Sequence, residues 1–215
     1  MAWIANQTWS NQKIFTSGFS ANGITQYLQP LLTPPWLKVP FFTLYKLTFI
    51  KGQAVGVASA QVHDSMFQGG AFRAELVVNW TYSLPEVAGL SLIYNHEPDS
   101  SYWASQDMSN KWSNVHAPGV HWTGWYDIFL QQNIDAYMGY QHNSSVAGYN
   151  YLIINPGGHC TVSEIDWPDA SAAITVLYLT ATKMFYQLNK SDNLDELKTA
   201  LNDTAMVYYY ILGNR

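Results

Sequence analysis

Short apolar strands that alternate with amphipathic helices set the strongest limit on what this chain can fold into. Residues 13–17, 54–60, 119–124 and 151–155 are short runs rich in apolar residues, which is typical of strands. Apolar residues at helical spacing follow two of these runs, namely Ile24, Tyr27, Leu28 and Leu31, and then Leu130, Ile134, Tyr137 and Met138, with Gln141 at the next position of the same stripe. This alternation predicts an α/β fold, with a mostly parallel sheet between flanking helices.

The composition narrows the class of protein and of partner. The chain has 215 residues, of which 48% are hydrophobic and 12% charged, and a formal net charge of −5. Such a chain buries a substantial core. Because it has no cluster of Lys and Arg, we expect no nucleic-acid partner, and no apolar run is long enough for us to expect a membrane partner. The single cysteine, Cys160, excludes an internal disulfide. The oligomeric state stays open.

The middle of the chain interrupts the alternation of strands and helices. From Ser65 to Ser113 it is irregular, helix-leaning and rich in Trp, Tyr and Asn, which is typical of an inserted cap. We therefore divide the chain into a first half of an α/β core (1–64), a helical cap (65–115), a second half of the core (116–190), and a linker with one strand (191–215).

Ser20 occupies a small-residue turn, G-F-S-A-N-G, between a predicted strand and a predicted helix. A sharp turn of this kind presents a nucleophilic serine at the edge of a sheet. The helix that follows it offers unpaired N–H groups to an oxyanion, and we expect the amide of Ala21 to be one of them. Turns of this composition are common, so Ser20 needs further support.

Asp127 and His159 supply that support. Asp127 follows a predicted strand that ends in T-G-W-Y, and His159 lies in the loop P-G-G-H-C after the strand Y-L-I-I-N. Both positions are just beyond the carboxyl ends of strands, where an open α/β sheet collects its reactive groups. The order Ser, Asp, His predicts Ser20 as nucleophile, His159 as general base and Asp127 as the acid that orients it.

At these residues the sequence resembles the cocaine-esterase and Xaa-Pro dipeptidyl-peptidase family of α/β-hydrolases. The G-W-Y-D segment, followed by a strand and a histidine, is the most specific part of the resemblance. The similar stretches are W-S-N-Q-K-I-F-T-S-G-F-S-A-N-G-I-T-Q at 9–26, P-P-W-L-K at 34–38, F-Q-G-G-A-F-R at 67–73, Y-W-A-S-Q-D at 102–107, P-G-V-H-W-T-G-W-Y-D-I-F-L at 118–130 and L-I-I-N-P-G-G-H at 152–159.

The resemblance implies a serine hydrolase that cleaves a small-molecule ester or a peptide, with Ser20, Asp127 and His159 as its catalytic triad. It implies no metal and no organic cofactor. Esterase and Xaa-Pro dipeptidyl-peptidase activities are both open at this point. The alternative is a catalytically inactive, truncated remnant or a partner-binding fragment.

The chain departs from the family pattern in three places. Asn22 stands where the family usually has glycine, and we expect a crowded turn there that relies on the tolerance of Asn for left-handed backbone. The family has upstream strands, an oxyanion-hole tyrosine and a C-terminal β domain, so we expect this chain to be part of a longer protein. Residues 39–53 interrupt the family's helix-to-strand link and are interpreted as an insertion, either a retained intron or a surface segment.

Other residues compete for a role in the site. Asp64 is a rival triad acid, and Cys160 is a rival nucleophile beside His159. Aromatic residues of the cap are candidates for lining a substrate pocket or for packing in the core: Phe67, Phe72, Trp80, Tyr102 and Trp103. The remaining histidines lack metal-ligand spacing and are interpreted as structural or surface residues: His63, His96, His116, His121 and His142.

Five Asn-x-Ser/Thr acceptor sites bear on the localisation. They begin at Asn6, Asn79, Asn143, Asn189 and Asn202. A secreted or lysosomal protein explains this number of sites, and so does a composition rich in Asn and Ser. The compartment therefore stays open.

Overall fold

The computed structural model describes most of the first 159 residues and a few short segments after them. The described residues are 2–31, 50–83, 93, 95–96, 100–159, 184, 186–191, 193–196 and 199. The predicted final strand, within 191–215, and Cys160 lie outside them.

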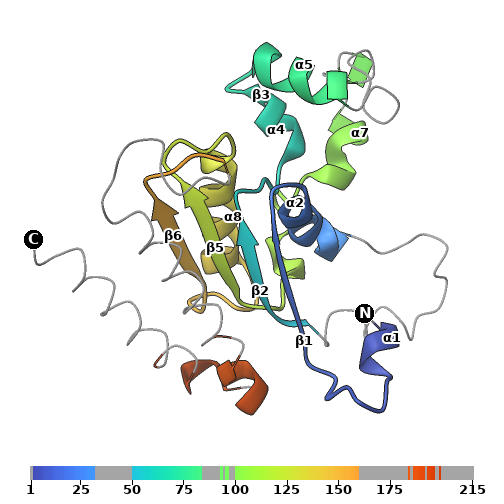
Figure 1. The fold of residues 1–215 in the computed structure, drawn as a ribbon, viewed down its shortest axis with the longest axis vertical. Helices are drawn as coiled ribbons and strands as arrows, with labels where there is room; N and C mark the ends of the chain where they lie inside the picture. Colours follow the sequence, from blue (N-terminus) through green and yellow to red (C-terminus); the bar gives the residue numbers. More distant parts are fainter. Residues whose placement is uncertain are drawn as a thin grey trace, which may run out of the picture.

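Four parallel strands form the central sheet (Figure 1). They lie in the order β1 (Ile14–Phe19), β2 (Ile50–Gly56), β5 (Gly119–Gly124) and β6 (Tyr151–Asn155). All residues of β5 and nearly all of β2 are buried, as expected for inner strands covered on both faces. The predicted α/β class, with a parallel sheet and flanking helices, is confirmed.

The second strand begins earlier than the sequence indicates. Residues 50–53, which the sequence analysis assigned to the end of an insertion at 39–53, form the first half of β2. Ile50 pairs with Ile14 of β1, and Gln53 pairs with both Thr16 and Gly119. These four residues are therefore part of the inner sheet, and no surface insertion extends through them. Residues 39–49 lie outside the described residues.

Two helices cover one face of the sheet. They are α2 (Ala21–Leu28), which continues into a 3₁₀ turn (Gln29–Leu31), and α8 (Leu130–Asn143). Tyr27 of α2 packs with Ala136 and Tyr140 of α8 against the small residues of β2 and its exit loop. The opposite face of the sheet packs against Met184 and Leu188.

The predicted helix is confirmed as α8, but the residues at apolar helical spacing are not the ones that it buries most deeply. Met138, in the predicted apolar stripe, is 46% exposed. The buried residues of α8 are Gln132, Asn133, Ala136, Gly139 and Tyr140. The side-chain amides of Gln132 and Asn133 donate to the carbonyls of Asp64 and Ala58, both at 3.4 Å. Polar residues bound to main-chain carbonyls thus take core positions that hydrophobic spacing assigns to apolar ones.

The core under α2 and α8 contains a buried polar cluster. His121 of β5 is fully enclosed, and its Nδ1 lies 2.7 Å from the hydroxyl of Tyr27. Tyr140 donates to Oε1 of Gln53 at 2.8 Å. The His121 ring also stacks on Tyr27 and meets Tyr137 and Tyr140 edge-on. Burial lowers the pKa of His121 to about 3, so this imidazole is neutral in the folded protein at pH 7.

The cap follows β2 and lies beyond one end of the sheet (Figure 1). It has a small core of its own, which includes Met66, Phe67, Val77 and Trp103. Helix α4 begins at Val62, three residues before the predicted start of the cap at residue 65. The exact boundary of the cap therefore stays a prediction. The described elements of the cap are α4 (Val62–Met66), β3 (Phe67–Gln68), β4 (Ala71–Phe72), α5 (Ala74–Ser83), α7 (Ser100–Trp103) and 3₁₀ turns at Ala104–Gln106 and Trp112–Asn114.

A further short helix, α1 (Ala2–Ala5), lies near the N-terminus. Within the part of the chain that the structure describes, none of the helices combines the length and the apolar character needed to cross a membrane.

The buried His121 predicts a loss of stability in acid. Unfolding returns its pKa from about 3 to the ordinary 6.5, so the unfolded chain binds the extra proton between these values. The free energy of unfolding should therefore fall as the pH drops from 6.5 towards 3, by up to about 1.4 kcal/mol per pH unit from this residue. Urea denaturation at several pH values measures the slope.

A matched pair of variants assigns that slope to one residue. His121→Asn should flatten the pH dependence, although it also lowers stability at pH 7 because packing is lost. His116→Gln removes an exposed imidazole that contacts Ser145 and should leave the slope unchanged. Equal slopes in the wild type and in His121→Asn would contradict the prediction.

Candidate active site

The turn at Ser20 is strained in the way a nucleophile turn requires. Ser20 directly follows β1 and precedes α2, with φ of 54°, a left-handed value that is costly for a residue with a side chain. Its N–H donates to the carbonyl of Gly56 at 3.1 Å, and its carbonyl accepts from Ile24 at 2.9 Å. Its hydroxyl makes no capping bond to the helix and is therefore available for another partner.

The expectation that Asn22 needs left-handed backbone is wrong. Asn22 lies in the first turn of α2, and Ser20 alone takes the positive φ in this turn. The turn is nevertheless crowded at Asn22, whose Cβ would lie 2.9 Å from a Cβ added at Gly18. It is also crowded at Gly23, where an added Cβ would lie 2.6 Å from Cβ of Ala58 and 3.0 Å from the carbonyl of Gly56. The glycine three residues after Ser20, rather than two, is the one that lets α2 pack on the strand.

Asp127 lies in a tight turn after β5, and its side chain is completely buried. Its Oδ1 accepts the N–H of Phe129 at 2.6 Å, and its own N–H donates to the carbonyl of Gly124 at 3.0 Å. A buried carboxylate needs such donors because it has lost its water. A main-chain donor such as the Phe129 amide leaves no signal in the sequence.

The loop that carries His159 is bonded to the loop that carries Asp127. The N–H groups of Trp125 and Tyr126 donate to the carbonyls of Asn155 and Gly157, at 2.9 and 3.0 Å. The fully buried side chain of Asn155 accepts the N–H of Gly157 at 3.2 Å. Asn155 is not among the residues predicted from the sequence. The N-P-G-G turn, which begins at Asn155, was the signal that could have identified it.

The structure brings Ser20, His159 and Asp127 together in one hydrogen-bonded row. The Nδ1 of His159 lies 2.9 Å from Oδ2 of Asp127, and its Nε2 lies 2.8 Å from Oγ of Ser20. Since the carboxylate can only accept, Nδ1 carries the ring proton and Nε2 accepts from the serine hydroxyl. The ring also meets Phe129 edge-on, with centroids 5.4 Å apart. This geometry makes Ser20 a candidate nucleophile with a base already in place.

The structure does not place the rival acid in this row. Asp64 lies in α4, its side chain is 59% exposed, and it contacts Nδ1 of the neighbouring His63 at 3.1 Å.

Ala21 is the first residue of α2, and a first-turn N–H has no acceptor within its own helix. Its amide is thus available to a ligand next to Ser20.

The aromatic candidates belong to the cap. Phe67 and Trp103 are buried in its core, whereas Phe72 and Tyr102 are half-buried against it. Trp80 lies in α5, and its side chain is outside the described residues.

In the described ranges no group of three His, Cys, Asp or Glu side chains could hold a metal ion. The other histidines either contact cap aromatics (His63, His96), contact Ser145 or Tyr27 (His116, His121), or lie exposed on α8 (His142).

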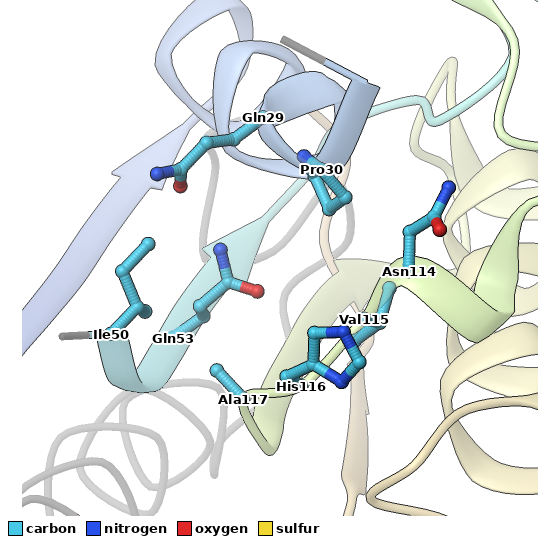
Figure 2. Close-up of a pocket in the computed structure, with 8 residues that line it drawn as sticks. All are labelled: Gln29, Pro30, Ile50, Gln53, Asn114, Val115, His116 and Ala117. Atoms are coloured by element: carbon cyan, nitrogen blue, oxygen red, sulfur yellow. The ribbon is translucent and has the colours of Figure 1, made fainter. Parts of the chain in front are cut away.

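A pocket lies between the 3₁₀ turn after α2, the first half of β2 and the segment that precedes β5 (Figure 2). It encloses about 270 Å³, part of it open to solvent. Ile50, the first residue of β2, is in its wall, whereas Ser20 follows the last residue of β1. The lining residues are Gln29, Pro30, Ile50, Gln53, Asn114, Val115, His116 and Ala117. It contains none of the residues of the hydrogen-bonded row.

The parallel sheet, the strained turn after β1 and the cap after β2 are features of the α/β-hydrolase fold. A family model described as "X-Pro dipeptidyl-peptidase (S15 family)" matches residues 1–89 and 83–161. The chain therefore belongs to the X-Pro dipeptidyl-peptidase (S15) family, which confirms the resemblance. A comparison with curated proteins gave no match.

Solved structures with similarity to the chain include three hydrolytic enzymes. The first is the acylaminoacyl peptidase of Pyrococcus horikoshii, at 11% identity and a TM-score of 0.49, over 87% of this chain and 26% of that one. A hydrolase from Pseudomonas aeruginosa PA01 has 15% identity and a TM-score of 0.37, over 78% and 65% of the two chains. The enol-lactonase of Burkholderia xenovorans LB400 has 12% identity and a TM-score of 0.37, over 79% and 66%. This chain thus spans about a quarter of the Pyrococcus horikoshii peptidase.

The contact between the two loops predicts that Gly124 tolerates no side chain. A Cβ at Gly124 would collide with the carbonyl of Gly157, which is main chain and cannot rotate away. Gly124→Ala should force the loops apart and lower the free energy of unfolding by about 1–3 kcal/mol. Urea denaturation followed by circular dichroism measures this loss.

Gly52→Ala is the matched control. Its added Cβ would lie 3.1 Å from Cε of Met184 and 3.2 Å from Cδ1 of Leu188, both ends of flexible side chains. We expect it to lose less stability than Gly124→Ala. If the two variants unfold at the same urea concentration, the close approach of the loops is not as described.

Proposed function

We propose that this protein is a serine hydrolase that transfers an acyl group to Ser20 and then to water. The observation that carries the proposal is the row in which Oγ of Ser20 lies 2.8 Å from Nε2 of His159, while Nδ1 of the same ring lies 2.9 Å from Asp127. A hydroxyl is a poor nucleophile unless a base takes its proton. Here the base is within hydrogen-bond distance and is itself held by a carboxylate.

The proton path follows from this arrangement. Oγ of Ser20 attacks the substrate carbonyl carbon as its proton moves to Nε2 of His159. The proton then passes to the leaving amine or alcohol as the bond to the carbonyl breaks. Water, deprotonated by His159, attacks the acyl-serine and restores Ser20 with release of the acid. The buried carboxylate of Asp127 stabilises the imidazolium in both halves. The reaction needs no metal or organic cofactor.

The developing oxyanion is assigned to the N-terminus of α2. The amide of Ala21 adjoins Ser20, and the dipole of an eight-residue helix favours negative charge at this end. One oxyanion donor of this kind is typically worth about 10² to 10³ in rate.

We propose peptides with proline in the second position as the substrate class, because the family description names an X-Pro dipeptidyl-peptidase. An ester is the second candidate, since the same acyl-transfer steps cleave either bond. Half-buried Phe72 and Tyr102 of the cap are assigned to substrate contact in this proposal, together with Trp80. Phe67 and Trp103 support them from the core of the cap.

Substitution of Ser20 tests the nucleophile. A fluorophosphonate probe should label the wild type and leave Ser20→Ala unlabelled. His159→Gln and Asp127→Asn should label at least about 10³-fold more slowly. The rate of labelling, followed by gel fluorescence or intact mass, is the measurement.

Ser17→Ala is the matched control, because Ser17 is an exposed serine on β1, three residues before Ser20. It should be labelled at the wild-type rate. Absence of labelling in soluble, folded wild type would favour the alternative, a catalytically inactive remnant or partner-binding fragment.

Two substrates separate the proposed specificities. We expect release of aniline from a Gly-Pro anilide with a higher kcat/KM than release of phenol from a simple phenyl ester, corrected for the intrinsic reactivity of each bond. Hydrolysis of the ester without hydrolysis of the anilide would indicate that the protein is an esterase and not an X-Pro dipeptidyl-peptidase. Ser20→Ala supplies the blank for both reactions.

A further inference from the structure

Arg73 links the cap to the loop that carries Asp127. It lies between β4 and α5, and its main-chain N–H donates to the carbonyl of Met66 at 2.8 Å. One guanidinium nitrogen, Nη1, donates to the carbonyl of Ser65 at 3.2 Å and to the carbonyl of Ile128 at 2.7 Å. Ser65 is in α4, whereas Ile128 follows the candidate triad acid directly. The arginine thus holds the main chain of both parts at one point.

The peptide group that Arg73 contacts is the one that holds Asp127. The carbonyl of Ile128 and the N–H of Phe129 belong to the same peptide bond, and that N–H donates to Oδ1 of Asp127 at 2.6 Å. A peptide bond is rigid and planar, so its carbonyl cannot turn without its N–H turning too. The guanidinium therefore fixes the direction of the donor that orients the carboxylate.

We infer that Arg73 is a positioning residue that couples the cap to the triad acid. The inference rests on the proposed function. A continuous series of polar contacts runs from the guanidinium through the Ile128–Phe129 peptide to Asp127, then to His159 and Ser20. A cation on the carbonyl is a stronger partner than a neutral donor, and it polarises the peptide so that its N–H donates more strongly. The position of the cap thus controls how firmly Asp127 holds His159.

A purely structural role for Arg73 makes a different prediction. The bond to Ser65 and the main-chain bond to Met66 brace the corner between α4 and α5. If that were the whole role, loss of the side chain would lower stability without changing the imidazole. Coupling to the triad predicts a change at His159 itself, which the contacts place three steps away.

The variants Arg73→Gln and Arg73→Lys test the coupling in the full chain. In the wild type, the proton between Nδ1 of His159 and Asp127 should give a far-downfield NMR resonance. Arg73→Gln should move it upfield and lower kcat for a phenyl ester by about 10- to 100-fold with KM nearly unchanged. Arg73→Lys keeps a cation that can donate to the Ile128 carbonyl, so both changes should be smaller. If Arg73→Gln does not fold, a smaller upfield shift in Arg73→Lys is the expected result.

Lys111→Gln is the matched control. Lys111 is also a cap cation that donates to two main-chain carbonyls, those of Ala104 and Asp107 at 2.6 and 2.9 Å, but both lie within the cap. Its loss should leave the resonance and kcat unchanged. The inference is overturned if the resonance stays in place in the folded Arg73 variants, or if Lys111→Gln moves it equally.

The two readouts separate failure of the inference from failure of the proposed function. If the wild type turns over no substrate but the resonance shifts in Arg73→Gln, the coupling holds and the hydrolase proposal fails. If the wild type is active and Arg73→Gln keeps both its kcat and its resonance, only the coupling fails.

Discussion

The buried carboxylate of Asp127 is the constraint on which the rest of this site depends. A carboxylate removed from water is stable only if donors replace the lost hydration. Here the Phe129 amide and the His159 ring supply one donor to each oxygen. The peptide that presents the Phe129 amide is held in turn by Arg73. The loops after β5 and β6 must therefore stay together, and Gly124, which leaves room for Gly157, is the residue that allows it.

The buried polar cluster around His121 links the elements that carry Ser20 and Asp127. Tyr27 belongs to the helix that follows Ser20, and His121 to the strand that leads to Asp127, and the two side chains lie 2.7 Å apart. Tyr140 adds a bond from α8 to Gln53 of β2. Buried polar pairs are costly when mismatched, so they favour one arrangement of neighbouring elements. The cluster therefore fixes α2 and α8 relative to β5 and β2, the strands on which they pack.

Sequence patterns predict the strands better than they predict how the strands and helices pack together. The strands near Ile14, Gly119 and Tyr151 were predictable, because short apolar runs between turns are a local signal. The start of β2 at Ile50 was not, since K-G-Q reads as a surface segment until its pairing with β1 is known. Asn133 and Arg73, whose side chains bond the main-chain carbonyls of Ala58 and Ile128, were missed because these partners are distant in sequence. The proximity of Ser20, Asp127 and His159 could be anticipated because parallel strands end at one edge.

The covalent intermediate is the most direct test of the account, because a turn that presents an activated serine should accept an acyl group. The protein would be mixed with p-nitrophenyl acetate, quenched in acid and digested, and the acetylated peptide located by tandem mass spectrometry. The account predicts acetyl on Ser20, absent when the base is replaced in His159→Gln. Acetyl on another residue, such as Cys160, or none in folded protein that still releases nitrophenol, would contradict it.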